Sequence, residues 1–135
     1  MTTAIEQVKQ SYGRCLGQDD FWGRFYEYLL KSSPKIAEKF ANTDFEKQKV
    51  LVKNSLNFVI MYADDPTGRF AKGKLEHVGD IHSHNNIDIP PNMYPLWIDS
   101  LINTVRDYDP KFTPELEKEW RAVVNPAIEL LKSRY

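Results

Sequence analysis

The amino-acid sequence predicts an all-α fold of about seven helices. Apolar side chains recur every three or four residues along successive segments, as they do on the inner faces of amphipathic helices. No segment shows the strict alternation of a strand, and capping residues and prolines interrupt the chain too often for a coiled coil. Because 135 residues suffice to bury a core, we expect residues 1–135 to form one domain.

The first two helices are predicted from their caps and apolar faces. Thr3 and Glu6 have the spacing of a capping box, and the apolar stripe after them stops near Gly17, a residue type favoured at helix ends. Either Asp19 or Asp20 is expected to cap the second helix. The inner face of that helix consists of Phe21, Trp22, Phe25, Tyr26, Leu29 and Leu30.

A short helix and a long helix are expected next. Ser33 followed by Pro34 predicts the start of a helix that runs to Phe40, because proline is favoured in the first helical turn. Thr43, with a glutamate three residues later, predicts a second capping box. The apolar stripe after Thr43 stops at an Asp-Asp-Pro-Thr-Gly break, where we expect the long helix to end.

Three further helices complete the prediction. One of them reaches about His82 and contains Gly73, which costs roughly 1 kcal/mol relative to alanine. After a turn at residues 83–91, a helix is expected to begin at Tyr94 and to end at an Asp-Pro pair. A Thr-Pro pair then predicts the start of the last helix, which Pro126 is expected to kink.

Composition and charge argue against several classes of protein. The formal net charge is −1 and the basic residues are spread along the chain, so we expect no nucleic-acid partner. No stretch approaches about 18 consecutive apolar residues, so we expect no membrane span. The polar N-terminal segment lacks the apolar core of a signal peptide. A single cysteine, Cys15, excludes an internal disulfide and fits a reducing compartment, so a cytoplasmic protein is expected.

The three histidines of the chain, His77, His82 and His84, lie close together in the sequence. His82 ends a helical stripe that includes Leu75 and Val78. An imidazole in this position is either a core side chain with a hydrogen bond or a metal ligand. With one cysteine, the chain has neither a Cys-Cys zinc site nor a Cys-x-x-Cys-His haem attachment.

A set of aromatic, apolar and hydrogen-bonding residues occurs in a characteristic order along nearly the whole chain. In chain order the set is Phe25, Tyr26, Pro34, Phe40, Gln48, Val52, Leu75, Val78, Gly79, His82 and Tyr94. The order and the spacings resemble those of the globin family, in particular bacterial single-domain haemoglobins and the haem domain of flavohaemoglobins. The resemblance implies a globin fold, with about seven helices around a haem pocket, and haem b held without a covalent bond.

On the distal side of a haem, the resemblance implies roles for five residues. Tyr26 and Gln48 correspond to the distal tyrosine and glutamine, and Val52 corresponds to the apolar residue above the iron. Phe40 corresponds to the phenylalanine that wedges against the haem, and Phe45 would fill space at the porphyrin edge. Two hydrogen-bond donors strengthen the binding of a partly negative oxygen ligand, which implies tight binding and slow release.

On the proximal side, the resemblance implies His82 as the iron ligand, in the neutral form that leaves one nitrogen free. Val78, one helical turn earlier, would then lie against the ring. The alternative ligand is His84, which stands at the more usual distance before Tyr94 but has Asp80 one turn earlier, a poor neighbour in a pocket that excludes water. Tyr94 is expected either to orient the proximal imidazole by a hydrogen bond or to pack against it.

The leading expectation is a haem protein that binds O₂, NO or CO at ferrous iron for capture, storage or sensing, without a dedicated chemical step. The closest alternative is an enzyme: a nitric oxide dioxygenase that uses an external reductase, or a weak peroxidase. The chain lacks the flavin and nicotinamide domains of flavohaemoglobins. It also has Tyr135 where those proteins place a glutamate behind the proximal histidine, and Glu129 lies a turn or more away. These two departures disfavour the enzyme.

Two alternatives without haem are a zinc-binding helical protein and a helical bundle that binds a partner protein. The three histidines could form part of a zinc site, although no Asp, Glu or Cys stands at a known zinc spacing. If haem is bound, a homodimer is a further candidate assembly, and the propionates need polar partners at the rim. The candidates for that role are His77, His84, Lys49, Lys53 and Arg69.

Overall fold

The computed structural model describes residues 3–18 and 20–135. Within these residues the chain consists of seven α-helices, one short 3₁₀ helix and no strand. The helices are α1 (Ala4–Leu16), α2 (Phe21–Ser32), α3 (Pro34–Lys39), α4 (Phe45–Asp64), α5 (Arg69–Ile81), α6 (Tyr94–Tyr108) and α7 (Pro114–Ser133), with the 3₁₀ helix η1 (Pro91–Met93) before α6. The predicted all-α fold is therefore confirmed.

Side-chain caps begin the first two helices as the sequence predicts. The Thr3 hydroxyl accepts a hydrogen bond from the amide three residues later at 3.1 Å, and Gly17 is the C-cap of α1. Of the two candidate caps of α2, Asp20 accepts from the Gly23 amide at 3.1 Å, while Asp19 lies outside the described residues. Asp20 has a left-handed backbone, with φ of 42°, which aspartate tolerates better than most residues.

The start of α4 corrects one prediction, because the expected cap Thr43 does not begin this helix. Asp44 does, and its carboxylate accepts hydrogen bonds from the amides of Glu46 and Lys47 at 3.1 and 3.4 Å. A carboxylate at a helix N-terminus also interacts favourably with the helix dipole, which explains why it replaces the neighbouring hydroxyl. The correction leaves the apolar face of α4 unchanged.

The last three helices begin and end close to the predicted residues. α5 ends one residue before His82, which is its C-cap. α6 begins at Tyr94 and ends before Asp109. Thr113 caps α7, which continues through the exposed Pro126. α6 therefore connects the turn after His82 with the turn at Asp109.

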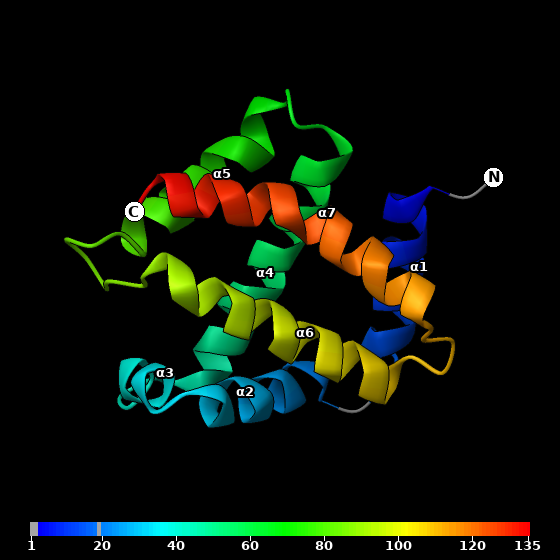
Figure 1. Cartoon of the computed structure of the whole chain (residues 1–135), viewed down its shortest axis with the longest axis horizontal. Coiled ribbons are helices and arrows are strands. Elements are labelled where there is room, and N and C mark those ends of the chain that lie inside the picture. The colour runs from blue at the N-terminus through cyan, green and yellow to red at the C-terminus, as the bar shows by residue number, and fades with distance from the viewer. Residues whose placement is uncertain (1–2, 19) are drawn as a thin grey trace.

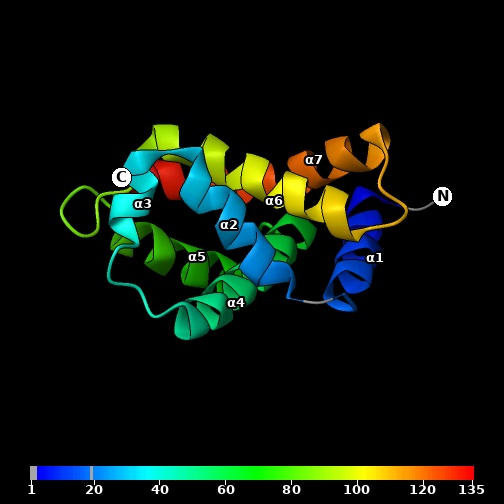
Figure 2. The same cartoon turned by 90° about the horizontal axis from the view of Figure 1, so that it is seen from below.

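The helices pack in two layers. Figure 1 shows α6 and α7 running across the front of the molecule, with α4 behind α6 and with α2 and α3 along the lower edge. Figure 2 shows α6 and α7 on one side and α4 and α5 on the other. α2 packs along α6, and α7 contacts α1, α4 and α5. No helix in the described part of the chain is both long enough and apolar enough to cross a membrane.

Most buried side chains form one core between these layers. Its largest fully buried members are Phe25, Leu56, Leu75, Leu101, Ile102 and Trp120. Cys15 is also fully buried there, and burial raises the pKa of its thiol to about 12. A second, smaller cluster is centred on Tyr94, Ile128 and Leu131. This smaller cluster lies where α5, α6 and α7 meet.

A polar network is buried where α6 ends. Asp109 accepts hydrogen bonds from the Ser11 hydroxyl at 2.6 Å and from Arg14 at 2.7 and 2.9 Å, and the Trp120 indole N–H donates to Ser11 at 2.9 Å. Burial acts to raise the pKa of Asp109, but hydrogen bonds from Arg14, Ser11 and the Lys111 amide lower it below its ordinary value. The network thus provides hydrogen-bond and ionic partners for a carboxylate whose burial without them would cost free energy.

Candidate functional site

His82 and Tyr94 meet where α5 ends and α6 begins. The Nδ1 atom of the His82 ring lies 3.4 Å from the Tyr94 hydroxyl oxygen, and the two ring centroids are 6.5 Å apart with their planes inclined by 33°. His82 is half-buried and Tyr94 is buried. This contact occupies Nδ1, and Nε2 makes no hydrogen bond within the described part of the chain.

Burial sets the protonation of both groups. It lowers the pKa of His82, so the ring is neutral at pH 7, and it raises the pKa of Tyr94 to about 12, so the phenol stays protonated. For Nε2 to bind a metal, Nδ1 carries the ring proton and donates it to the Tyr94 oxygen. A neutral imidazole that is oriented through one nitrogen and free at the other is suited to metal ligation.

Apolar side chains surround this pair. Val78, one turn before His82 on α5, is half-buried and packs against the cluster of Tyr94, Ile128 and Leu131. Three of the predicted site residues, Val78, His82 and Tyr94, therefore lie together, and we call them the proximal group.

Tyr26 and Gln48 meet between α2 and α4. Tyr26 is only 4% exposed, and burial raises the pKa of its hydroxyl to about 12, an effect that the polar Gln48 side chain opposes. Gln48 lies one turn inside α4 and is half-buried. The pair thus presents a phenol and a primary amide, both of which can donate hydrogen bonds at pH 7.

Two phenylalanines stand beside Tyr26. Phe40 follows α3 and Phe45 begins α4, and their ring centroids lie 5.6 and 5.3 Å from that of Tyr26. The two phenylalanine rings are stacked at 6.1 Å and are only half-buried. Val52, one turn beyond Gln48, is buried in the main core. We call these five residues the distal group.

The structure thus gathers the predicted site residues into two groups rather than scattering them. Trp97 and Ile98, near the start of α6, pack against both the main core and the smaller cluster. The ring centroid of Trp97 lies 5.7 Å from that of Phe25, which lies 5.0 Å from that of Tyr26, so packed aromatic side chains link the smaller cluster to the distal group. The half-buried rings of the two groups leave apolar surface available to a ligand.

The other two histidines lie outside the proximal group. His77 is exposed on α5. The His84 side chain is 67% exposed, and its Nδ1 atom lies 3.3 Å both from an Asp88 carboxylate oxygen and from the Tyr135 hydroxyl. Within residues 3–18 and 20–135, no three His, Cys, Asp or Glu side chains gather in a metal-binding arrangement.

The cations that the sequence offered as propionate partners differ in their pairing. Lys49 forms ion pairs with Asp20 at 3.4 Å and with Glu46 at 3.7 Å, so two carboxylates already neutralise it. Lys53 and Arg69 are exposed. Lys39, which sequence reasoning did not include, reaches from α3 to the turn after α5.

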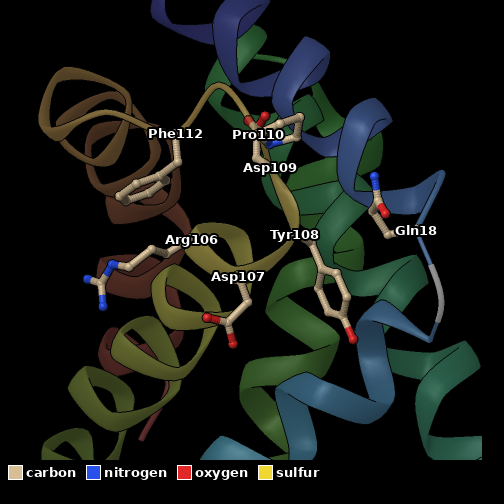
Figure 3. Close-up of a pocket in the computed structure, with 7 residues that line it drawn as sticks. All are labelled: Gln18, Arg106, Asp107, Tyr108, Asp109, Pro110 and Phe112. Atoms are coloured by element: carbon tan, nitrogen blue, oxygen red, sulfur yellow. The ribbon is translucent and has the colours of Figure 1, made fainter.

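Two surface grooves lie elsewhere, and neither is lined by the two groups. One of about 530 Å³ lies at the far end of α6 (Figure 3) and is lined by Gln18, Arg106, Asp107, Tyr108, Asp109, Pro110 and Phe112. Another of about 320 Å³ lies beside the start of α2, with Trp22 and Lys53 in its wall. At the usual helical rise, the length of α6 separates Tyr94 from the first groove by about 20 Å.

Sequence reasoning did not predict the contacts that Lys39, Arg134 and Tyr135 make with α5 or with the turn after it. The Lys39 ammonium donates to the Ile87 carbonyl at 3.1 Å. Arg134 and Tyr135 reach back to α5 and the turn from the end of α7, and Tyr135 contacts His84 rather than His82. The sequence signal for the Arg134 contact is Gly79. A glycine inside a helix has no side chain, so another residue can pack closely against the helix at that position.

Seven helices in two layers bring together a histidine whose pKa burial lowers and a buried tyrosine beside a half-buried glutamine, so the chain is an all-α protein with a candidate ligand-binding site. Residues 23–129 match the family model described as Globin, and the chain belongs to the globin family. The globin fold expected from the sequence is thereby confirmed.

A solved structure agrees with this assignment. The chain is similar to the crystal structure of PA3967 from Pseudomonas aeruginosa PAO1, a protein described as structurally highly homologous to a human haemoglobin. The two are 38% identical, the match covers 98% of each chain, and the TM-score is 0.92. No curated protein matches the chain.

Proposed function

We propose that this globin binds haem b without a covalent bond, with His82 as the iron ligand, and that it binds O₂, NO or CO for capture, storage or sensing. The observation that carries the proposal is the contact between His82 and Tyr94, which orients a neutral imidazole through Nδ1 and leaves Nε2 free. The similarity to a protein described as homologous to a human haemoglobin supports the same assignment.

The residues of both groups fit a haem. A porphyrin needs flat apolar walls, and Phe40, Phe45 and Val78 are apolar side chains that the fold leaves half-buried. His82 offers the neutral imidazole that haem iron requires. When bound, ferrous haem supplies an iron atom with one open position for a diatomic gas.

Each side chain then has a defined task. Tyr94 fixes the rotation of the His82 ring, and Val78 keeps water away from it. On the other side, Tyr26 stays protonated because its pKa is about 12. Its hydroxyl and the Gln48 amide can both donate hydrogen bonds to a gas ligand, which slows the release of a ligand that carries partial negative charge.

Binding without turnover is the role that this site supports best. The partner of the His82 ring is the Tyr94 hydroxyl, and burial is the cause of the lowered pKa of His82. A carboxylate partner would instead make the imidazole more basic and push electron density toward the iron. Tyr135, at the position of the flavohaemoglobin glutamate, contacts His84 and Asp88. We therefore propose gas binding rather than nitric oxide dioxygenation.

Hemin titration followed by absorption spectroscopy tests the proposal. We expect the purified chain to take up hemin stoichiometrically and to show an intense haem band that shifts when the reduced protein is exposed to carbon monoxide. A protein that stays colourless after hemin is added would contradict the proposal.

A matched pair of variants tests the assignment of the ligand. His82→Ala should greatly weaken hemin binding, because the half-buried imidazole beside Tyr94 is lost. His84→Ala, two residues away and exposed, should bind hemin like the unmodified protein. The opposite result would assign the iron to His84.

A further inference from the structure

Arg134 and Tyr135, which follow α7, contact α5 and the turn that comes after His82. Figure 1 shows this end of the chain, marked C, beside the loop between α5 and α6. We call these two residues the Arg134–Tyr135 clamp. Within the described residues, neither of them is hydrogen-bonded to His82 itself.

Arg134 binds α5 through two carboxylates. Its Nε and Nη2 atoms donate to the two oxygens of Asp80, both at 2.9 Å, and Nη1 donates to Glu76 at 3.2 Å. A planar guanidinium holds a carboxylate in such a two-point contact with a defined orientation. Because Asp80 lies two residues before His82, Arg134 fixes the last turn of α5.

Gly79 makes room for this contact. A Cβ atom added at Gly79 would lie 2.8 Å from the Cγ atom and 2.9 Å from the Cβ atom of Arg134, which is too close without a shift. Glycine is unfavourable inside a helix, so its presence on the buried side of α5 has to be explained by packing. The close approach of Arg134 provides that explanation.

Tyr135 holds the turn that follows His82. Its hydroxyl donates to the Asp88 carboxylate at 2.5 Å and lies 3.3 Å from His84 Nδ1, and the His84 amide donates to the Tyr135 carbonyl oxygen at 3.4 Å. Asp88 has a left-handed backbone with φ of 53°, which aspartate tolerates better than most residues. The hydrogen bond from Tyr135 holds the Asp88 side chain in this turn.

Backbone hydrogen bonds connect this turn to His82. The Ile89 amide donates to the His82 carbonyl oxygen at 2.9 Å, and the Ile87 amide donates to the Ile81 carbonyl oxygen at 3.1 Å. Asp88, which Tyr135 holds, lies between these two bonded residues. These bonds connect the position of Asp88 to the end of α5.

We propose that Arg134 and Tyr135 are positioning residues that set the orientation of His82 toward haem iron. The inference rests on the proposed function of His82. Arg134 fixes the helical turn before His82, Tyr135 fixes the turn after it, and neither touches the imidazole. When the clamp is removed, the end of α5 becomes free to move, Nε2 is less well aligned, and haem leaves faster.

The first experiment measures haem loss and iron ligation in the holoprotein. For the double variant Arg134→Gln and Tyr135→Phe, we expect haem transfer to excess apomyoglobin to become roughly three- to tenfold faster. Loss of each exposed polar contact should raise the rate of haem loss by a factor of roughly two to three. The iron–imidazole stretching band of the ferrous protein should shift or broaden. Arg134→Lys, which keeps the charge but lacks the planar fork, should give a smaller change.

Two further variants separate positioning from general stability. Arg121→Gln is the matched control, because Arg121 lies on α7, whose C-cap is Arg134, and its side chain is 42% exposed against 36% for Arg134. Arg121 also pairs with two carboxylates, Glu117 at 3.0 Å and Asp99 at 3.1 Å. Arg121→Gln should leave haem loss and the stretching band unchanged. Gly79→Ala, which displaces Arg134 without removing its charge, should reproduce the effect of Arg134→Gln.

A second experiment needs no haem. In the apoprotein, the double clamp variant should speed hydrogen exchange at the Ile87 and Ile89 amides and shift the NMR signals of the His82 ring, while Arg121→Gln should do neither. Unchanged exchange, or equal changes in the Arg121 control, would overturn the inference. If the unmodified chain fails to take up hemin, the proposed function fails instead, and this second experiment still reports whether the clamp positions His82.

Discussion

The polar groups at the two ends of α6 differ in how completely they are hydrogen-bonded. At one end, the buried Asp109 carboxylate accepts hydrogen bonds from Ser11 at 2.6 Å and from Arg14 at 2.7 Å, and the Trp120 indole donates to Ser11 at 2.9 Å. At the other end, the His82 ring has one nitrogen held by Tyr94 at 3.4 Å and the other free. The phenylalanines of the distal group, at this same end, remain half-buried.

This difference separates a part of the molecule that stabilises the fold from a part that is prepared for a ligand. A network whose polar groups already have hydrogen-bond partners is not stabilised by a further partner. A free ring nitrogen and half-buried aromatic rings are both stabilised when a ligand binds them. Substitutions at the Asp109 end should therefore change unfolding and spare ligand binding. Substitutions near His82 should change ligand binding and spare unfolding.

The largest expected effect is that of Asp109→Asn. Removing the buried charge leaves Arg14 without its ionic partner, so we expect the free energy of unfolding to fall by about 3 kcal/mol in urea denaturation. Asp107→Asn is the control, because Asp107 pairs with Arg24 on the surface and should cost less than about 1 kcal/mol. Similar losses in the two variants would contradict the contrast between the two ends.

Tyr26→Phe should produce the next largest effect, and on binding rather than on folding. Loss of one hydrogen bond to a partly charged ligand costs about 1.5–3 kcal/mol, so oxygen dissociation measured by stopped flow should become about tenfold faster or more. Tyr28→Phe on the same helix, whose hydroxyl donates to Asp107, should leave that rate unchanged. An unchanged rate in Tyr26→Phe would remove Tyr26 from the ligand side of the site.

Acid should weaken the Asp109 network in a predictable direction. Its pKa is lowered in the folded protein, so the carboxylate contributes stability that is present above the unfolded pKa of about 4 and is lost as the pH falls through the lowered value. Urea denaturation at a series of pH values should show this loss. The acid dependence should be flatter in Asp109→Asn, and equal slopes in the two proteins would argue against a paired carboxylate.

The smallest expected effect is an increase in the stability of the fold. Gly73 is exposed on α5 and a Cβ atom there would meet nothing within 4 Å, so Gly73→Ala should raise the free energy of unfolding by up to about 1 kcal/mol. Gly79→Ala, six residues later on the same helix, should give no such gain, because its Cβ atom would meet Arg134. Equal stabilisation by both substitutions would show that Arg134 moves away at no cost.

Local sequence signals predicted the helices well because caps and apolar periodicity act within a few residues. Thr3, Ser33 and Thr113 begin helices as expected, and His82 ends α5. The error at Thr43 arose because its neighbour Asp44 offers the stronger cap, a competition that a spacing rule does not resolve.

Contacts between residues far apart in the sequence were the part that could not be predicted. Ser11 and Asp109 are 98 positions apart, and nothing local indicates that their side chains meet. The same holds for Arg134, which lies 54 positions from Asp80. The members of the proximal group were named in advance through a family resemblance, yet the features that support His82 over His84, namely burial and the contact with Tyr94, required the fold.

The rate at which Cys15 reacts with an alkylating reagent can report how often the core around α1 opens. Cys15 is the sole cysteine of the chain, its side chain is fully enclosed, and its pKa of about 12 keeps it in the unreactive thiol form. Alkylating reagents should therefore label it only when the packing around α1 comes apart. Timed labelling followed by mass measurement would rank every variant by how often its interior opens, whether or not a coloured ligand is present.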